Sequence, residues 1–180
     1  MRRWQVAGAL IAGPASNDIG APGVLLVQNL RRNGSLDWTP PGGVIELHQG
    51  EAILDGLERE VREETGLIVT GWSGLAYSVV ATAPGLGWEM SVEVHVADVV
   101  EGELTIGNDP DGIVVAADYF GHGECDELTV AGHRWVRDPL LEWLSLALAS
   151  PGSSMGTDRP VYRYQLEGST PGSTSIHRLE

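Results

Sequence analysis

The most constraining feature of this 180-residue sequence is an acid-rich segment, residues 51–65, whose charge pattern a solvated helix does not explain. Its apolar residues recur with helical spacing, and one arc about 100° wide holds Ile53, Leu54, Leu57 and Val61. Gly66 follows at the position where a left-handed C-cap belongs. We therefore predict a helix over residues 51–65 that buries this arc.

Three glutamates on that helix occupy an unfavourable place. Glu60, Glu63 and Glu64 are spaced i, i+3 and i+4, so they cluster beside the buried arc and near the negative end of the helix dipole. Like charges placed there repel one another and resist desolvation. Two explanations stay open. Neighbouring arginines, chiefly Arg59, satisfy the charges, or the carboxylates bind Mg²⁺ or Mn²⁺, which prefer oxygen ligands.

The overall charge limits the partners that such a chain can have. Its 25 acidic and 11 basic residues give a net charge of −14, which repels nucleic acid and anionic membranes. A phosphate-bearing ligand would therefore need cations at its site. No apolar run approaches the roughly 18 to 20 residues of a membrane span. The single cysteine, Cys125, excludes an internal disulfide, so we expect a cytoplasmic protein without a nucleic-acid or membrane partner.

The remaining pattern predicts a mixed α/β (α+β) domain with helices on a sheet. A hairpin turn is expected at Asn33-Gly34, and a second helix is expected to open at Asp138-Pro139, with Asp as N-cap and Pro at the first helical position. We expect strands at residues 6–12, 24–30, 36–39, 67–70, 75–81, 90–100 and 113–120.

The composition changes at residue 150, after which Ser, Gly, Thr and Pro dominate. We therefore expect one domain over residues 1–149 and a tail over residues 150–180. The tail contains one strand-like island at residues 161–166. It docks either on the domain or on a partner subunit.

Taken together, these residues resemble the signature of the Nudix hydrolase family. Trp38-Thr39-Pro40-Pro41-Gly42-Gly43 is similar to the usual approach to the motif, and seven residues separate Glu51 from the core of the motif. That core is Arg59-Glu60-Val61-Arg62-Glu63-Glu64-Thr65-Gly66-Leu67. Many fixed positions at fixed spacing make the resemblance specific. One departure is that seven residues separate Gly43 from Glu51, where the family has five. We place the two-residue insertion within residues 46–50, which include His48.

The resemblance implies a Nudix fold, in which helices enclose a mixed β-sheet, and hydrolysis of a diphosphate bond in a nucleoside diphosphate linked to another moiety. It implies Mg²⁺ or Mn²⁺ held by Glu60, Glu63, Glu64 and a backbone carbonyl of Gly42 or Gly43. Arg59 and Glu51 would orient these ligands and pin the loop. Gly66 would only end the helix. The candidates for the general base are Glu60, Glu64 and Glu89, with Asp111, Glu124 and Glu127 as weaker alternatives.

Glu89 is included because residues 83–89 loosely resemble a proline-containing segment of ADP-ribose pyrophosphatases. Arg31 and Arg32 flank the hairpin turn and either hold phosphate or are solvated. The rings of Trp88, Trp135 and Tyr119 either stack on a nucleobase or, as is more common, belong to the core.

The expected partner is a small-molecule nucleotide. ADP-ribose or a nucleotide sugar is the first expectation, and a modified dNTP such as 8-oxo-dGTP is the second. The alternative function is a non-catalytic nucleotide sensor, although the three motif glutamates are intact. A homodimer is a further expectation from the resemblance.

Overall fold

The computed structural model describes residues 1–17, 21–106, 109–149, 159–170 and 174–179. Its strands are β1 (Arg2–Leu10), β2 (Ala12–Pro14), β3 (Pro22–Leu30), β4 (Leu36–Thr39), β5 (Gly42–Val44), β6 (Ile68–Ala83), β7 (Trp88–Glu101), β8 (Val114–Phe120), β9 (Val161–Glu167) and β10 (Ser175–Leu179). The α-helices are α1 (Ile53–Thr65), α2 (His122–Leu128) and α3 (Arg134–Ala149), and the 3-10 turns are η1 (Leu47–Gln49), η2 (Pro84–Leu86) and η3 (Thr129–Ala131).

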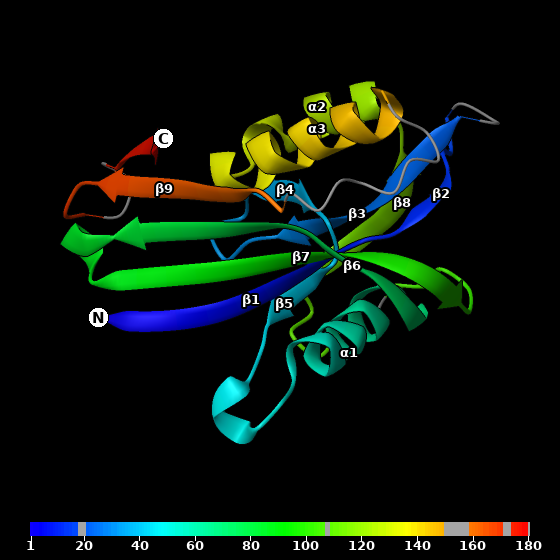
Figure 1. Cartoon of the computed structure of the whole chain (residues 1–180), viewed down its shortest axis with the longest axis horizontal. Coiled ribbons are helices and arrows are strands. Elements are labelled where there is room, and N and C mark those ends of the chain that lie inside the picture. The colour runs from blue at the N-terminus through cyan, green and yellow to red at the C-terminus, as the bar shows by residue number, and fades with distance from the viewer. Residues whose placement is uncertain (18–20, 107–108, 150–158, 171–173, 180) are drawn as a thin grey trace.

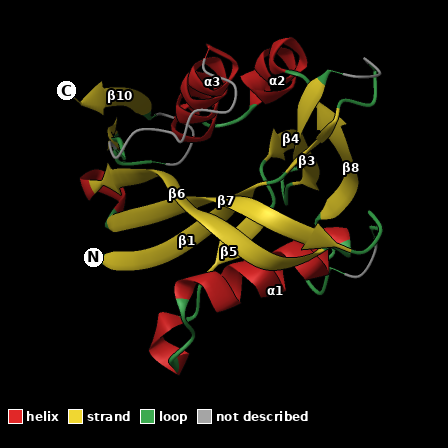
Figure 2. Cartoon of the chain, turned by 45° about the vertical axis from the view of Figure 1, so that its right-hand side comes forward, coloured by secondary structure: helices red, strands yellow, loops and turns green. Residues whose placement is uncertain are grey.

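Two sheets organise the molecule (Figure 2). The larger one has the strand order β10-β9-β6-β7-β1-β5 and is mixed, because β1 runs parallel to β7 and β9 runs parallel to β6. The smaller one joins β2, β3 and β4, with β8 paired to the other edge of β3. The prediction of a mixed α+β domain is confirmed.

Helices cover both faces of the larger sheet, with α1 below it and α2 and α3 above it in Figure 1. The alternation of side chains along β1 explains how one strand serves both layers. Ala7, Ala9 and Ile11 pack with Leu57 and Val61 of α1. On the other face, Leu10 joins a separate core cluster that contains Val94 of β7 together with Trp135 and Leu140 of α3.

The helix α1 begins at Ile53, two residues later than predicted, because Ala52 has extended backbone angles and serves as the N-cap. Its end agrees with the sequence: Gly66 has a φ of 73°, and its N–H bonds to the carbonyl of Arg62. The predicted hairpin is also present. Gly34 has a φ of 82° at the turn, and β3 and β4 pair in antiparallel register.

The predicted start of the last helix is wrong. α3 begins at Arg134 rather than at Asp138, so Pro139 lies inside the helix. Asp138 pairs with Arg134 one turn earlier, at 3.0 Å, instead of capping an N-terminus. Pro139 is the sixth residue of the helix, so it lacks the N–H that would otherwise donate to the carbonyl of Trp135. The short helix α2 and the turn η3 had no counterpart in the prediction.

Strand β6 joins the segments that the sequence suggested as two strands, and its pairing with β7 is interrupted by register shifts between Val69 and Tyr77. The strand-like island of the tail is β9, which pairs with β6, and β10 extends the sheet beyond it. Residues 150–158 lie outside the described part of the chain. No helix in the described ranges is long and apolar enough to cross a membrane.

Candidate active site

The glutamates of α1 lie on the side of the helix that meets strand β5. Leu57 and Val61 are fully buried and fix the rotation of the helix on the sheet, whereas Leu54, at the edge of the predicted arc, is exposed. Glu64 lies one turn after Glu60 and is itself only 6% exposed. A carboxylate this deeply buried needs a specific partner to offset the loss of hydration.

The backbone of β5 supplies that partner. The N–H of Gly42 donates to Oε2 of Glu64 at 2.8 Å. Gly42 has a φ of +146°, and a Cβ there would lie 2.2 Å from the carbonyl oxygen of Ala7, so only glycine fits. A Cβ on Gly43 would lie 2.3 Å from Oε2 of Glu60. The two glycines therefore bring the β5 backbone into direct contact with the carboxylates of Glu60 and Glu64.

Arg59 connects the helix with the preceding loop. Its Nε bonds to Oε1 of Glu51 at 2.9 Å, and a second nitrogen bonds to Oε2 at 3.2 Å, which makes a bidentate pair. Oε2 of Glu51 also accepts the N–H of Glu46 at 2.8 Å. These bonds lower the pKa of Glu51, chiefly through Arg59. The loop that contains η1, where the insertion is predicted, is thereby tied to α1.

The same guanidinium also reaches two motif glutamates. Nη1 of Arg59 lies 2.7 Å from Oε1 of Glu60 and 3.1 Å from Oε2 of Glu63. The hydrogen bonds with Glu51 raise the pKa of Arg59 further, so it remains a cation. One explanation offered by the sequence was that neighbouring arginines satisfy the glutamates. This explanation holds for Glu60 and Glu63. It does not account for Glu64, whose carboxylate accepts the N–H of Gly42 instead.

Burial is the main cause of the unusual electrostatics of the cluster. It raises the pKa of Glu64 to about 8, and the carboxylates of Glu60 and Asp109 add to the rise. The pKa of Glu60 is also raised, first by burial and then by Glu63 and Asp111, while Arg59 opposes the shift. The loop between β7 and β8 thus brings two further acids to the cluster.

Asp109 organises that loop. Its carboxylate accepts the backbone N–H groups of Asp111, Ile113 and Val114 at 2.9, 2.9 and 3.1 Å. A carboxylate with three such donors holds the turn in a fixed shape. The sequence Asn108-Asp109-Pro110 favours a turn, but nothing in it indicates that this turn lies beside the glutamates of α1.

The donor set suits a hard divalent cation in its chemistry. Glu60, Glu63 and Glu64 offer carboxylate oxygens, and the glycines of β5 leave room for them against the backbone. Within the described ranges, no three acidic, His or Cys side chains already converge as a ligand set. Nη1 of Arg59 occupies oxygens of both Glu60 and Glu63, so a bound cation would replace these two hydrogen bonds.

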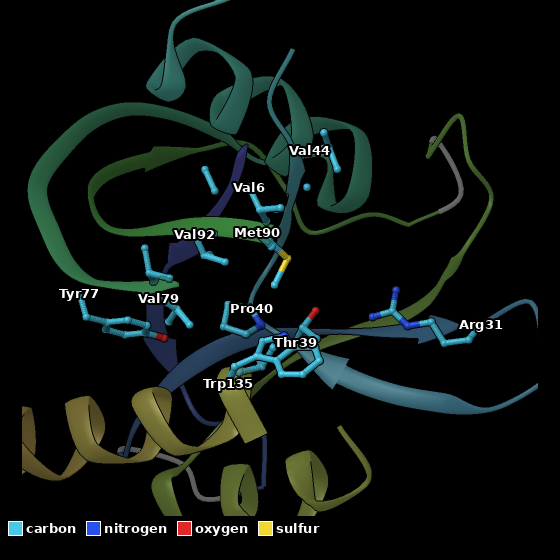
Figure 3. Close-up of a pocket in the computed structure, with 16 residues that line it drawn as sticks. Val6, Arg31, Thr39, Pro40, Val44, Tyr77, Val79, Met90, Val92 and Trp135 are labelled. Carbon is cyan, nitrogen blue, oxygen red and sulfur yellow. The ribbon is translucent and has the colours of Figure 1, made fainter. Parts of the chain in front are cut away.

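A pocket of about 270 Å³ opens next to this cluster, between the larger sheet and the start of α3 (Figure 3). We call it the substrate pocket. Gly42 and Gly43 form the part of its wall that faces the glutamates. The rest of its lining is mainly apolar and includes Val6, Tyr77, Val79, Met90, Val92 and Trp135.

Arg31 is the charged group of the substrate pocket. Its Nε lies 3.1 and 2.9 Å from the two carboxylate oxygens of Asp37, and a terminal nitrogen lies 2.9 Å from Oδ1. Asp37 is buried and also accepts a hydrogen bond from Asn29 at 3.2 Å. The hairpin therefore holds Arg31 in place, and Asp37 is a functional candidate that sequence reasoning missed. Arg32, the other predicted arginine, is exposed.

Glu89 is not part of the glutamate cluster. It lies on β7 opposite Arg3, with which it pairs at 3.4 Å. Gly43 pairs with Ala7 of the same strand, so Glu89 lies four residues further along β1, or about 13 Å at roughly 3.3 Å per residue. Glu124 caps α2 through the N–H of Gly121.

The aromatic candidates divide between the two cores. Trp135 lines the substrate pocket, and His133 stacks on it with ring centroids 4.1 Å apart. Trp88 lies beside Trp135 in an edge contact at 6.3 Å. Tyr119 packs against the cluster under α1 and does not line the substrate pocket. Of the three predicted rings, Trp135 is the one positioned to meet a ligand.

Comparisons with known proteins agree with this arrangement. The family model of the NUDIX domain matches residues 3–144. No curated protein matches the chain. Among solved structures, the chain is similar to the ORF135 protein of E. coli, with 21% identity and a TM-score of 0.63 over 85% of this chain and 96% of that one.

Two further solved structures are similar. For the MutT NUDIX hydrolase of Burkholderia pseudomallei, the identity is 21% and the TM-score 0.61 over 80% and 99% of the two chains. For a C. elegans Ap4A hydrolase, the values are 16% and 0.57 over 81% and 98%. At these identities the likeness establishes the fold, which is the Nudix fold. Since the family model also spans most of the sequence, the chain belongs to the NUDIX domain family.

Proposed function

We propose that this Nudix hydrolase cleaves a diphosphate bond in a nucleoside diphosphate linked to another moiety. One observation carries the proposal: Gly42 and Gly43 contact the carboxylates of Glu64 and Glu60 and also line the substrate pocket. A ligand in the pocket would therefore place its phosphates beside the acidic cluster. The chain's net charge of −14 would repel such a ligand unless cations neutralise the site.

Glu60, Glu63 and Glu64 are the residues that would hold a divalent cation, with a carbonyl of Gly42 or Gly43 nearby. Nudix hydrolases generally use divalent metal ions, and we propose Mg²⁺ or Mn²⁺ here. When bound, such an ion neutralises phosphate oxygens and lowers the pKa of a water molecule. Glu51 and Arg59 position the carboxylates and the loop, because their bidentate pair joins the two.

A carboxylate of the cluster accepts the proton of the attacking water. Glu60 and Glu64 are the candidates from α1, and Asp111 approaches Glu60 from the loop before β8. Glu89 is the candidate outside the cluster. Its pairing with Arg3, about 13 Å along β1, argues for the glutamates of α1 instead.

Arg31 binds a phosphate of the substrate. It lies in the pocket wall, and its pairing with Asp37 holds the guanidinium in one orientation before the substrate arrives. Arginine is suited to phosphate because its planar fork donates two parallel hydrogen bonds. Trp135 then offers an aromatic surface to the base.

The substrate that we propose first is ADP-ribose or a nucleotide sugar, and a modified dNTP such as 8-oxo-dGTP is the second. The similar C. elegans structure is that of an Ap4A hydrolase, so a dinucleoside polyphosphate belongs in the same set of trials. All of these ligands combine a planar base with a chain of phosphates, as the pocket and cluster together require.

The test is chromatography of the nucleotide products from ADP-ribose, sugar nucleotides, Ap4A and oxidised dNTPs, with and without Mg²⁺ or Mn²⁺. Wild type is compared with Glu63→Gln and Glu64→Gln, and Glu58→Gln is the matched control because Glu58 pairs with Arg62 on the solvated face. We expect metal-dependent turnover that falls on the order of 100-fold or more in the first two variants only. Tight nucleotide binding without turnover on any substrate would replace the hydrolase with a nucleotide sensor.

A further inference from the structure

The substrate pocket contains a hydroxyl group that has no partner in the protein. Tyr77 of β6 lines the pocket and is only 2% exposed. Its hydroxyl makes no hydrogen bond within the described part of the chain. Burial raises the pKa of Tyr77, so the group stays protonated and can both donate and accept.

The hydroxyl of Tyr77 is a polar group in a mainly apolar part of the pocket wall. Figure 3 shows the ring entering the pocket next to Val79, with the hydroxyl on the pocket side, and it shows Arg31 at the opposite end. Between them the lining is apolar, with Met90 and Val92 from the sheet and Trp135 from α3. The pocket thus has a cation at one end, an apolar middle and a neutral hydrogen-bonding group at the other end.

Strand β9 holds the ring of Tyr77 in position through Tyr162. Tyr162 meets it in an edge-to-face contact, with ring centroids 5.8 Å apart and an interplanar angle of 89°. The guanidinium of Arg178, from β10, lies 4.8 Å from the centroid of the Tyr162 ring and forms an ion pair with Glu142 of α3. The two strands that follow residue 158 therefore back the wall of the pocket, although the family match ends at residue 144.

We propose that Tyr77 is a specificity-determining residue whose hydroxyl hydrogen-bonds the polar edge of a nucleobase, and that β9 sets its position through Tyr162. The proposal deepens the proposed function and rests on it. The parts of a nucleotide fit these groups in the same order along the pocket. The phosphates lie beside Arg31 and the glutamates, and the base stacks in the apolar middle. The far edge of the base then meets Tyr77.

The position of the hydroxyl gives this assignment a distinctive signature. The oxygen of Tyr77 faces the pocket, so a base that fills the pocket displaces the hydration of this hydroxyl and must replace it with a hydrogen bond. Phenylalanine at position 77 would keep the ring contact with Tyr162. Removal of the hydroxyl should therefore weaken the binding of a base while leaving the melting temperature nearly unchanged.

Tyr164 provides a matched control within the same cluster. Its hydroxyl is buried and has no hydrogen-bond partner among the described residues, the residue is 1% exposed, and it does not line the pocket. Tyr77→Phe and Tyr164→Phe thus remove the same atom from neighbouring buried sites. A difference between them in ligand affinity reports contact with the ligand rather than a change in the core.

The experiment is calorimetric titration of the whole protein with AMP, GMP, CMP and UMP, and with ribose 5-phosphate, which lacks a base. We expect Tyr77→Phe to weaken the best-bound mononucleotide about three- to tenfold, the range for one hydrogen bond. Ribose 5-phosphate affinity should not change, and Tyr164→Phe should match wild type throughout. An unchanged mononucleotide affinity in Tyr77→Phe would overturn the proposal, as would equal weakening of ribose 5-phosphate.

The role of β9 is tested with Tyr162→Leu, Tyr162→Phe and the control Arg163→Ala, because Arg163 is exposed on β9 between two buried positions. Loss of the edge contact in Tyr162→Leu should weaken the mononucleotide as in Tyr77→Phe, and Tyr162→Phe should restore the affinity. Equal affinity in all three variants would refute the role of β9.

The outcome is separable from that of the proposed function. Turnover with a KM that Tyr77→Phe does not alter would refute the specificity role alone. Base-dependent binding without turnover would refute the hydrolase alone. Mononucleotides that bind no better than ribose 5-phosphate would count against both.

Discussion

Gly43 and Glu60 are so close that a Cβ on the glycine would lie 2.3 Å from Oε2 of the glutamate. Glycine at position 43 is therefore needed for Glu60 to keep its carboxylate in place. Because this carboxylate is the end of a flexible side chain, an added Cβ would move it aside. We expect Gly43→Ala to displace Glu60 and lower kcat by at least about tenfold, while the free energy of unfolding changes by less than about 1 kcal/mol. Steady-state kinetics and urea unfolding measure the two effects. Gly123→Ala is the control, because a Cβ there meets nothing within 4 Å.

Replacement of Arg59 by lysine tests whether its positive charge is sufficient or whether its bidentate hydrogen bonding is also needed. Lysine keeps the positive charge but cannot form the bidentate pair with Glu51 while also reaching Glu60 and Glu63. We expect kcat to fall by about 10- to 100-fold, the usual range for a residue that supports metal ligands. Arg62→Lys, on the solvated face of α1, should behave as wild type. Comparable losses in both variants would show that the helix, not the pairing, is affected.

Asp109 acts on the cluster through the loop that it holds. Asp109→Ala removes the acceptor of three backbone N–H groups, so Asp111 should lose its fixed position near Glu60. We expect kcat to fall by about tenfold, with faster amide hydrogen exchange confined to residues 109–114. Exchange that stays slow there would contradict this role. Asp55→Ala, on the exposed side of the first turn of α1, is the control.

Asp37→Asn should change substrate affinity more than turnover. The amide cannot balance the charge of Arg31, so the guanidinium loses the bidentate partner that orients it. We expect KM to rise about tenfold with little change in kcat, because Arg31 is proposed to contact the ground-state phosphates. Asp126→Asn removes an exposed partner of Arg137 and should leave KM as it is. A fall in kcat alone would refute the assignment.

The thiol of Cys125 should not react with thiol reagents in the native protein over a wide pH range. It is fully buried, its Sγ donates to the carbonyl of Phe120 at 3.6 Å, and burial raises its pKa to about 12. A raised pKa keeps the reactive thiolate absent until the solution is strongly alkaline. A thiol reagent should therefore label the chain only after addition of urea, both at pH 7 and at pH 9. Rapid labelling of the folded protein at pH 9 would disprove the assignment.

The features that the sequence predicts well are those whose conformation depends on residues within the same short segment. The end of α1 at Gly66 follows from a residue that tolerates positive φ, and the hairpin at Gly34 has the same cause. The closeness of Glu60 and Glu64 to the glycine pair was implied by resemblance, and the structure adds the hydrogen bond between Gly42 and Glu64.

Other features depend on contacts between distant segments, which no local pattern specifies. Nothing near Tyr77 in the sequence indicates that Tyr162 will lie behind it. Asp138 and Pro139 form a good capping pair in the sequence, yet α3 begins at Arg134, five residues before Pro139, and Trp135 of its first turn packs into the core. No local pattern singles out the Asp37 carboxylate, because its importance comes from Arg31, which lies six residues earlier, just after the end of β3.

The pairing of β9 with β6 has a consequence for the order of folding. Thr82 donates to the carbonyl of Tyr164 across 82 residues of chain, and parallel strands joined over such a span form slowly because the loop must close first. The cluster side of the pocket has the same requirement, because β5 pairs with β1, and β1 forms a parallel pair with β7 in which Arg2 lies opposite Trp88. Both walls of the pocket therefore depend on slow closure of long stretches of chain, so the pocket should be completed late in folding.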